Sequence, residues 1–183
     1  MNSRASVSGD ERIRLFLALR LPDDALDEIE HWQRAELREV RAVPREHLHV
    51  TLAFLGHRPA AELGAIVDVL RAAATDAGEI RLTPIRYRQT RSVGMLVLDD
   101  EGDRASLLAR GLHERLEALG VYRREGRAWL PHLTVARWRE RPRLRPETPP
   151  ARTFVPSDAA AYLSRLHPSG AQYEVLESVA LGG

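Results

Sequence analysis

The sequence contains no cysteine and no lysine, and each absence removes a class of chemistry. Without cysteine the chain has no disulfides, no thiolate nucleophile and no cysteine-ligated zinc or iron–sulfur site. All 27 basic residues are arginine, so a P-loop lysine, a Schiff base and the lysyl-nucleotide intermediate of an ATP-driven ligase are excluded as well. A coding bias toward arginine explains the missing lysine, and the exclusions hold whatever its origin.

Long apolar runs are also absent. None approaches the roughly 20 residues that a transmembrane helix needs, and residues 1–11 lack the apolar stretch of a signal peptide. With 183 residues, 44% of them hydrophobic, the chain is long enough to bury a core. We therefore expect a cytoplasmic protein of one domain, 1–183, with 1–11 as a flexible N-terminus. A monomer is expected because no apolar helix face is left over.

The net charge of +1 conceals an uneven distribution. Residues 23–39 carry seven acids against two arginines, whereas residues 121–145 carry eight arginines against two acids. Residues 80–91 add four arginines and no acid. The planar guanidinium suits phosphate, so an anionic substrate, nucleic acid among the candidates, is the natural inference. For residues 139–145 a solvated loop is an equally good interpretation.

The sequence His-x-Thr-apolar-Ala occurs twice, at residues 49–53 and again 83 positions later. Composition alone predicts only about 0.3 His-x-Thr triplets in a chain of this length. Because side chains alternate along a strand, the His and Thr of each copy would share one face and the apolar residues the other. We interpret the pair as a duplicated half-site, made of His49, Thr51, His132 and Thr134.

Hydrophobic periodicity predicts helices and strands in a mixed order. Strands are expected at 12–19, 48–55, 80–87, 95–98 and around the second motif, helices at 23–41, 60–75 and 103–119 with Asp23 and Asp103 as N-caps, and a C-terminal hairpin at 160–166 and 172–179. The fold class is α+β, with two lobes of strands and helices that each contribute one His-x-Thr strand. A two-histidine site would assemble in the cleft between the lobes.

The repeated motif resembles the paired HxTx motifs of the two-histidine (2H) phosphoesterases. Flanking stretches extend the resemblance over most of the chain, at 14–22, 48–56, 131–137 and 163–176. More closely, the chain is similar to the bacterial and archaeal RNA 2',3'-cyclic phosphodiesterases, also called 2'-5' RNA ligases or the LigT/ThpR family. One departure precedes the second motif, where Leu130 stands at a place that often holds a cation in the family.

The resemblance implies a bilobal, pseudo-twofold fold in which each lobe holds an antiparallel sheet. It also implies a site without metal or cofactor. The substrate would be an RNA end with a 2',3'-cyclic phosphate, tRNA fragments among them, or a small cyclic nucleotide. His132 would be the proton acceptor that activates water and His49 the proton donor to the 3' oxygen, leaving a 2'-phosphate. Run in reverse, the same site would join such an end to a 5'-hydroxyl without ATP.

Physical chemistry agrees with this pattern. In-line opening of a cyclic phosphate needs a base on the water side and an acid on the leaving oxygen. A histidine with a pKa near 6.5 can do either task, and the symmetry of the motifs leaves open which does which. The hydroxyls of Thr51 and Thr134 could donate to the non-bridging oxygens.

Two arginines are further candidates for phosphate binding, Arg127 and Arg137. Arg137 lies an odd number of residues after His132, so in a regular strand it would face away from the site. Trp129 is expected in the core rather than as a stacking platform for a base.

Two rival hypotheses remain open from the sequence. His47 and His49 would share a strand face and, with His132, could ligate a metal that activates water. Alternatively, the basic cleft could be an RNA-end-binding module in which catalysis is incidental. The four other histidines, His31, His57, His113 and His167, are expected to be structural or solvated.

Overall fold

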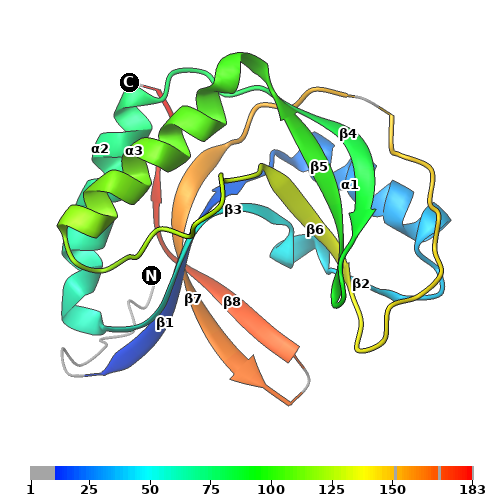
Figure 1. The fold of residues 1–183 in the computed structure, drawn as a ribbon, viewed down its shortest axis with the longest axis horizontal. Coiled ribbons are helices and arrows are strands. Elements are labelled where there is room, and N and C mark those ends of the chain that lie inside the picture. Colours follow the sequence, from blue (N-terminus) through cyan, green and yellow to red (C-terminus); the bar gives the residue numbers. More distant parts are fainter. Residues whose placement is uncertain (1–10, 151, 169, 183) are drawn as a thin grey trace, which may run out of the picture.

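The computed structural model describes residues 11–150, 152–168 and 170–182, and over these ranges the chain forms two four-stranded sheets and three α-helices (Figure 1). The strands are β1 (Arg12–Arg20), β2 (Arg41–Ala42), β3 (His49–Pro59), β4 (Leu82–Gln89), β5 (Val93–Asp100), β6 (His132–Arg137), β7 (Asp158–His167) and β8 (Gly170–Val179). The helices are α1 (Asp23–Glu36), α2 (Leu63–Asp76) and α3 (Arg104–Ala118), with 3-10 turns η1 (Arg45–His47), η2 (Ala60–Glu62) and η3 (Glu101–Asp103). The α+β prediction is confirmed, whereas the expected flexible segment falls almost wholly outside the described residues.

Each sheet is assembled from segments that lie far apart in the sequence. The first sheet has the order β3-β1-β7-β8 and the second β2-β6-β5-β4, and neighbouring strands run antiparallel. Helices α2 and α3 pack against each other beside the first sheet, and α1 lies against the second (Figure 1). No helix within the described ranges has the length and apolar character to cross a bilayer.

Strand β1 shows how one segment serves two faces. Leu15, Leu17 and Leu19 are completely buried in the main core, as the alternation predicts. Phe16 and Ala18 point the other way and join a smaller buried cluster with residues of β7. Of this cluster, Phe16 also lines the first cavity described below.

Several predicted boundaries are wrong, and tertiary hydrogen bonds explain them. Helix α1 ends five residues before Arg41, because Arg41 and Ala42 pair with the end of β6. Its N-cap is Pro22 rather than Asp23. Asp103 makes no capping bond for α3. Instead, the carboxylate of Asp100 accepts from the backbone N–H groups of residues 105 and 106, at 2.9 and 2.7 Å.

Candidate active site

The two motif strands belong to different sheets and are in contact where the sheets meet. β3 carries His49 and Thr51, and β6 carries His132 and Thr134. In both, the apolar residues of the motif are buried, while the histidine and threonine stay partly exposed. The predicted division of each strand into a core face and an open face is confirmed.

Each histidine ring is fixed by the same hydrogen bond. Nδ1 of His49 lies 2.8 Å from the carbonyl oxygen of His47, and Nδ1 of His132 lies 2.8 Å from that of Leu130. A carbonyl oxygen only accepts, so Nδ1 carries the proton in both rings. Nε2 is therefore the atom left for chemistry in each ring. It accepts a proton when the ring is neutral and donates one when the ring is charged.

A β-bulge follows the His-x-Thr sequence in β3. Thr51 lies opposite Ala18 and Ala53 lies opposite Leu17, so Leu52 is an extra residue between two paired positions. Such an insertion moves the side chains that follow it by one place and reverses which face they occupy, in β3 as far as a second irregularity at Leu55.

The same bulge occurs at the same place in β6. Thr134 lies opposite Met95 and Ala136 opposite Gly94, which leaves Val135 as the extra residue. The duplication therefore includes the backbone irregularity as well as the motif.

The bulges bring the sixth residue of each copy, Phe54 and Arg137, to the open face. Both line one cavity with His49 and Thr51. The expectation that Arg137 faces away from the site is wrong, because it assumed a regular strand. Phe54, its counterpart in the first copy, is 49% exposed and has no assigned role from the sequence.

Buried polar side chains satisfy the carbonyl oxygens of both bulges. Nε2 of His113, on α3, donates to the carbonyl of Leu52 at 2.8 Å. Nε2 of Gln33, on α1, donates to the carbonyl of Val135 at 2.9 Å and to that of Val43 at 3.0 Å. Because these side chains are buried and their partners belong to the motif strands or adjoin them, they hold the irregular backbone in place.

Aromatic rings surround His49. The centroid of its ring lies 4.9 Å from that of Phe16, 5.6 Å from that of Tyr173 and 5.8 Å from that of Tyr162. Phe16 and Tyr162 are themselves stacked, with centroids 4.7 Å apart and planes inclined by 1°. This apolar enclosure makes the charged form of the imidazole costly.

Burial lowers the pKa of His49 from 6.5 to about 4, although the bond to the His47 carbonyl acts in the opposite direction. The positive charge of Arg137 lowers this pKa further, and His47 and His132 do so when they are protonated. In the unliganded protein His49 is therefore neutral at pH 7. An anion bound among these cations would oppose their effect and raise the pKa.

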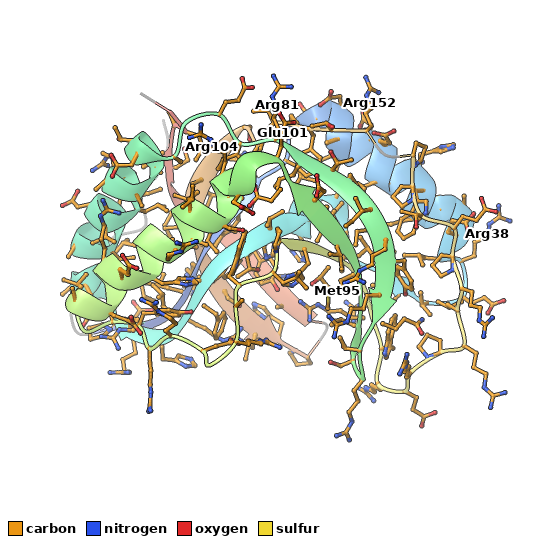
Figure 2. All side chains as sticks on the ribbon, turned by 45° about the horizontal axis from the view of Figure 1, so that its top comes forward. Arg38, Arg81, Met95, Glu101, Arg104 and Arg152 are labelled. Carbon is orange, nitrogen blue, oxygen red and sulfur yellow. The ribbon has the colours of Figure 1, made fainter. Side chains whose placement is uncertain are left out.

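Two cavities flank the motif strands. The first has a volume of about 360 Å³ and is lined by His49; the second, about 530 Å³, is lined by His132. Thr51 and Phe54 line both. Met95, labelled on β5 in Figure 2, belongs to the second cavity.

Arg127 and Trp129 also lie at the second cavity. Arg127 is 84% exposed, and its Nε donates to Glu125 at 2.8 Å, so part of its charge is already paired. Trp129 is partly buried against the main core while also lining this cavity, and its Nε1 donates to the carbonyl of Thr51 at 3.0 Å. This hydrogen bond connects a residue of the second cavity to β3, the strand of the first motif.

The three-histidine arrangement is not present in the structure. His47 lies in η1 rather than on β3, and its ring packs against Tyr173 with centroids 4.5 Å apart. Across the described ranges no three His, Asp or Glu side chains are grouped so that they could hold a metal ion. His47 therefore does not share a strand face with His49.

Sequence reasoning missed several residues of the site, namely Arg14, Gln33, Phe54, Tyr162, Ser164 and Tyr173. One available signal was the repeat itself, since Phe54 stands in the first copy where Arg137 stands in the second. Arg14, Ser164 and Tyr173 lie in stretches that share the family resemblance, but the sequence does not show that these stretches meet at His49. Gln33 and Tyr162 carry no such signal.

A two-lobed fold in which each lobe supplies one His-x-Thr strand defines a class of paired-histidine proteins, and comparison with known proteins agrees. This chain belongs to the 2'-5' RNA ligase superfamily, whose family model matches residues 21–167. It is 23% identical to an RNA 2',3'-cyclic phosphodiesterase of Methanocaldococcus jannaschii over 182 residues, which cover 90% of this chain and 99% of that protein.

Solved structures show the same fold. The crystal structure of Escherichia coli LigT complexed with NADP+ matches with a TM-score of 0.80 and 25% identity, over 94% of this chain and 99% of that one. The protein TT0787 of Thermus thermophilus matches with a TM-score of 0.78 and 29% identity, over 93% and 99% of the two chains.

Proposed function

We propose that this protein is an RNA 2',3'-cyclic phosphodiesterase that opens the cyclic phosphate at an RNA end to a 2'-phosphate. The observation that carries the proposal is the pair of histidines, His49 and His132, each with Nδ1 bound to the carbonyl two residues earlier and Nε2 left free. Two such groups on strands in contact suit a reaction that needs one acid and one base. The curated relative, named as an RNA 2',3'-cyclic phosphodiesterase, supports the substrate class.

The reaction is a displacement at phosphorus. Nε2 of His132 takes a proton from water as the water oxygen bonds to phosphorus. The bond from phosphorus to the 3' oxygen breaks, and Nε2 of His49 gives that oxygen a proton. Thr51 and Thr134 donate hydrogen bonds to the non-bridging oxygens, where charge gathers. Arg137, on the same face through its bulge, pairs with the phosphate, and Arg127 makes a more peripheral contact.

The pKa of His49 bears on its role. A donor must be protonated, yet burial lowers this pKa to about 4 in the unliganded protein. We propose that the bound phosphate restores the proton, because an anion beside His49 and Arg137 offsets the burial and the neighbouring positive charge. The opposite assignment, with the neutral His49 as base, is the second candidate that this pKa favours.

A 5'-hydroxyl in place of water would give a 2'-5' linkage by the same displacement, without ATP. The superfamily name, 2'-5' RNA ligase, supports this activity. Water is in large excess over RNA ends, so hydrolysis is the expected main reaction. We propose that the protein acts as a monomer, which size-exclusion chromatography with light scattering tests.

The test follows adenosine 2',3'-cyclic phosphate by phosphorus NMR in excess EDTA. Wild type should give only the 2'-phosphate, and His49→Ala and His132→Ala should each lower the rate on the order of 10²-fold or more. His31→Ala, an exposed position on α1, is the matched control. Loss of activity in EDTA would contradict the metal-free mechanism, and inert wild type on this and on RNA ends would leave RNA binding as the function.

A further inference from the structure

Arg14 is held in the first cavity by two contacts that leave most of its donors free. Its Nη1 donates to Oγ of Ser164 at 2.8 Å, and Ser164 is itself buried. Its guanidinium carbon lies 4.6 Å from the centroid of the Phe54 ring. A serine hydroxyl uses one of the five N–H donors of the guanidinium, so the others remain for a further partner.

In the part of the chain that the structure describes, Arg14 lacks an acidic partner, as does the exposed Arg12 on the same strand, but of these two arginines Arg14 alone lines the first cavity. Arg20 pairs with Asp158 at 3.2 Å and Arg58 with Glu62 at 2.7 Å, whereas no ion pair of Arg14 occurs among the described residues. The guanidinium is only partly exposed and lines the cavity that contains His49. A partly buried cation without a counter-charge, next to a candidate phosphate site, is suited to a second anion.

The place of Arg14 on β1 determines where a second phosphate would lie relative to the cyclic phosphate at His49. Phe16, whose ring is 4.9 Å from that of His49, separates Arg14 from the histidine. In the pairing of β1 with β3, Arg14 lies opposite His57 and His49 lies opposite Arg20, so Arg14 reaches the cavity farther along the strands than His49, at Phe54. The exposed Phe54 ring beside Arg14 offers an apolar surface in between.

We propose that Arg14 binds the phosphodiester on the 5' side of the terminal nucleotide, so that the protein prefers an RNA end to an isolated cyclic nucleotide. This inference rests on the proposed function. His49, Thr51 and Arg137 hold the cyclic phosphate, the terminal nucleoside lies along the exposed ring of Phe54, and Arg14 pairs with the next phosphate. Arg14 thereby acts on specificity and takes no part in proton transfer.

The experiment compares two substrates that differ by this one phosphate. They are adenosine 2',3'-cyclic phosphate and the dinucleotide ApA with a 2',3'-cyclic phosphate end. For wild type, kcat/KM should be about tenfold higher for the dinucleotide, as expected for one charge-assisted contact. In Arg14→Gln this ratio should fall toward one. In Ser164→Ala, which removes only the hydroxyl that orients Arg14, the ratio should fall by less.

Arg12→Gln is the matched control. Arg12 lies two residues earlier on the same strand face, is exposed, and donates to the carbonyl of His57 at 2.8 Å, so its removal should leave the ratio unchanged. Salt gives a second readout. Loss of one phosphate contact should reduce the slope of log kcat/KM against log salt by about 0.7 for the dinucleotide.

The outcomes separate this inference from the proposed function. If neither substrate reacts, the proposed function fails. If both react equally well with wild type, or if Arg14→Gln lowers both rates by the same factor, the protein hydrolyses cyclic phosphates but Arg14 does not read a 5' phosphate, and the inference is wrong.

Discussion

Leu52 in β3 and Val135 in β6 hold the same place in the two halves of the molecule. Each is the extra residue of a β-bulge directly after His-x-Thr, and the carbonyl of each accepts a hydrogen bond from a buried side chain on a helix. The donors differ, His113 in one half and Gln33 in the other. The geometry of the duplicated site is therefore kept by different residues in its two copies.

Replacing His113 by leucine should destabilise the fold by about 1–3 kcal/mol, because it leaves the Leu52 carbonyl buried without its donor. His113→Gln keeps an N–H donor and should lose less. Urea unfolding measures the stability. A lower kcat would show that Thr51, which precedes Leu52, has moved. His31→Leu, exposed on α1, is the control. Equal losses in the leucine and glutamine variants would contradict a role for the hydrogen bond.

Gln33→Leu should also destabilise the protein, again by about 1–3 kcal/mol. The carbonyl of Val135 keeps the backbone N–H of Val43 at 2.9 Å, so the orphaned acceptor is the carbonyl of Val43 itself. The loss of this hydrogen bond should therefore loosen the backbone at Val43, directly after β2, which pairs with β6 at Arg137. Gln172→Leu, an exposed position on β8, is the matched control, and unfolding in urea compares the two.

The bulges mark the point at which sequence patterns stop predicting the site. The order of strands and helices and the meeting of the two motifs follow from periodicity and repetition. A bulge has no residue signature of its own, and parity therefore misplaced Arg137. The one signal was that two apolar residues adjoin in each copy, Leu52-Ala53 and Val135-Ala136, where strict alternation would place one of them outside.

Other features depended on partners that the sequence does not reveal. β2 has two residues and exists because β6 offers it an edge. Arg14 on β1 and Ser164 and Tyr173 on β7 and β8 line the cavity of His49, although β1 and β7 lie more than 100 residues apart in the sequence. Local propensity cannot predict such convergence, because it is a property of the sheet order.

The stability of the protein should fall in mild acid because of His49. Its pKa is about 4 in the folded protein and 6.5 for an unperturbed histidine, so between these values the unfolded chain binds more protons. Above pH 6.5 the lowered pKa does not reduce the free energy of unfolding. As the pH falls to about 4, the free energy of unfolding decreases by about 3 kcal/mol. Urea unfolding of wild type and His49→Gln at pH 7.5 and 4.5 tests this. An identical pH dependence in the two proteins would contradict the lowered pKa.

Gly94 should not tolerate a side chain. It lies opposite Ala136 beside the second bulge, and an added Cβ would lie 2.9 Å from Cη2 of Trp138 and overlap the hydroxyl of Tyr87. Gly94→Ala should cost about 1–3 kcal/mol through this overpacking. Gly64→Ala is the control, since nothing lies within 4 Å of its Cβ position on α2 and alanine favours the helix. Thermal unfolding distinguishes them, and equal stability of the two variants would contradict the close packing at Gly94.

A substrate with sulfur in place of the 3' oxygen should separate the acid from the base. A thiolate leaves without a proton, so the histidine that donates becomes dispensable while the one that activates water does not. If His49 is the donor, His49→Ala should be slowed about 10²–10⁴-fold on the oxygen substrate and far less on the sulfur one, whereas His132→Ala should be slowed on both. Single-turnover rates keep product release out of the comparison. The reverse pattern would make His49 the base, as its low pKa in the unliganded protein favours, and would place water on the side of the first cavity. Equal losses on both substrates for both variants would show that neither histidine protonates the departing 3' oxygen, which would overturn the assignment of one histidine as acid and the other as base.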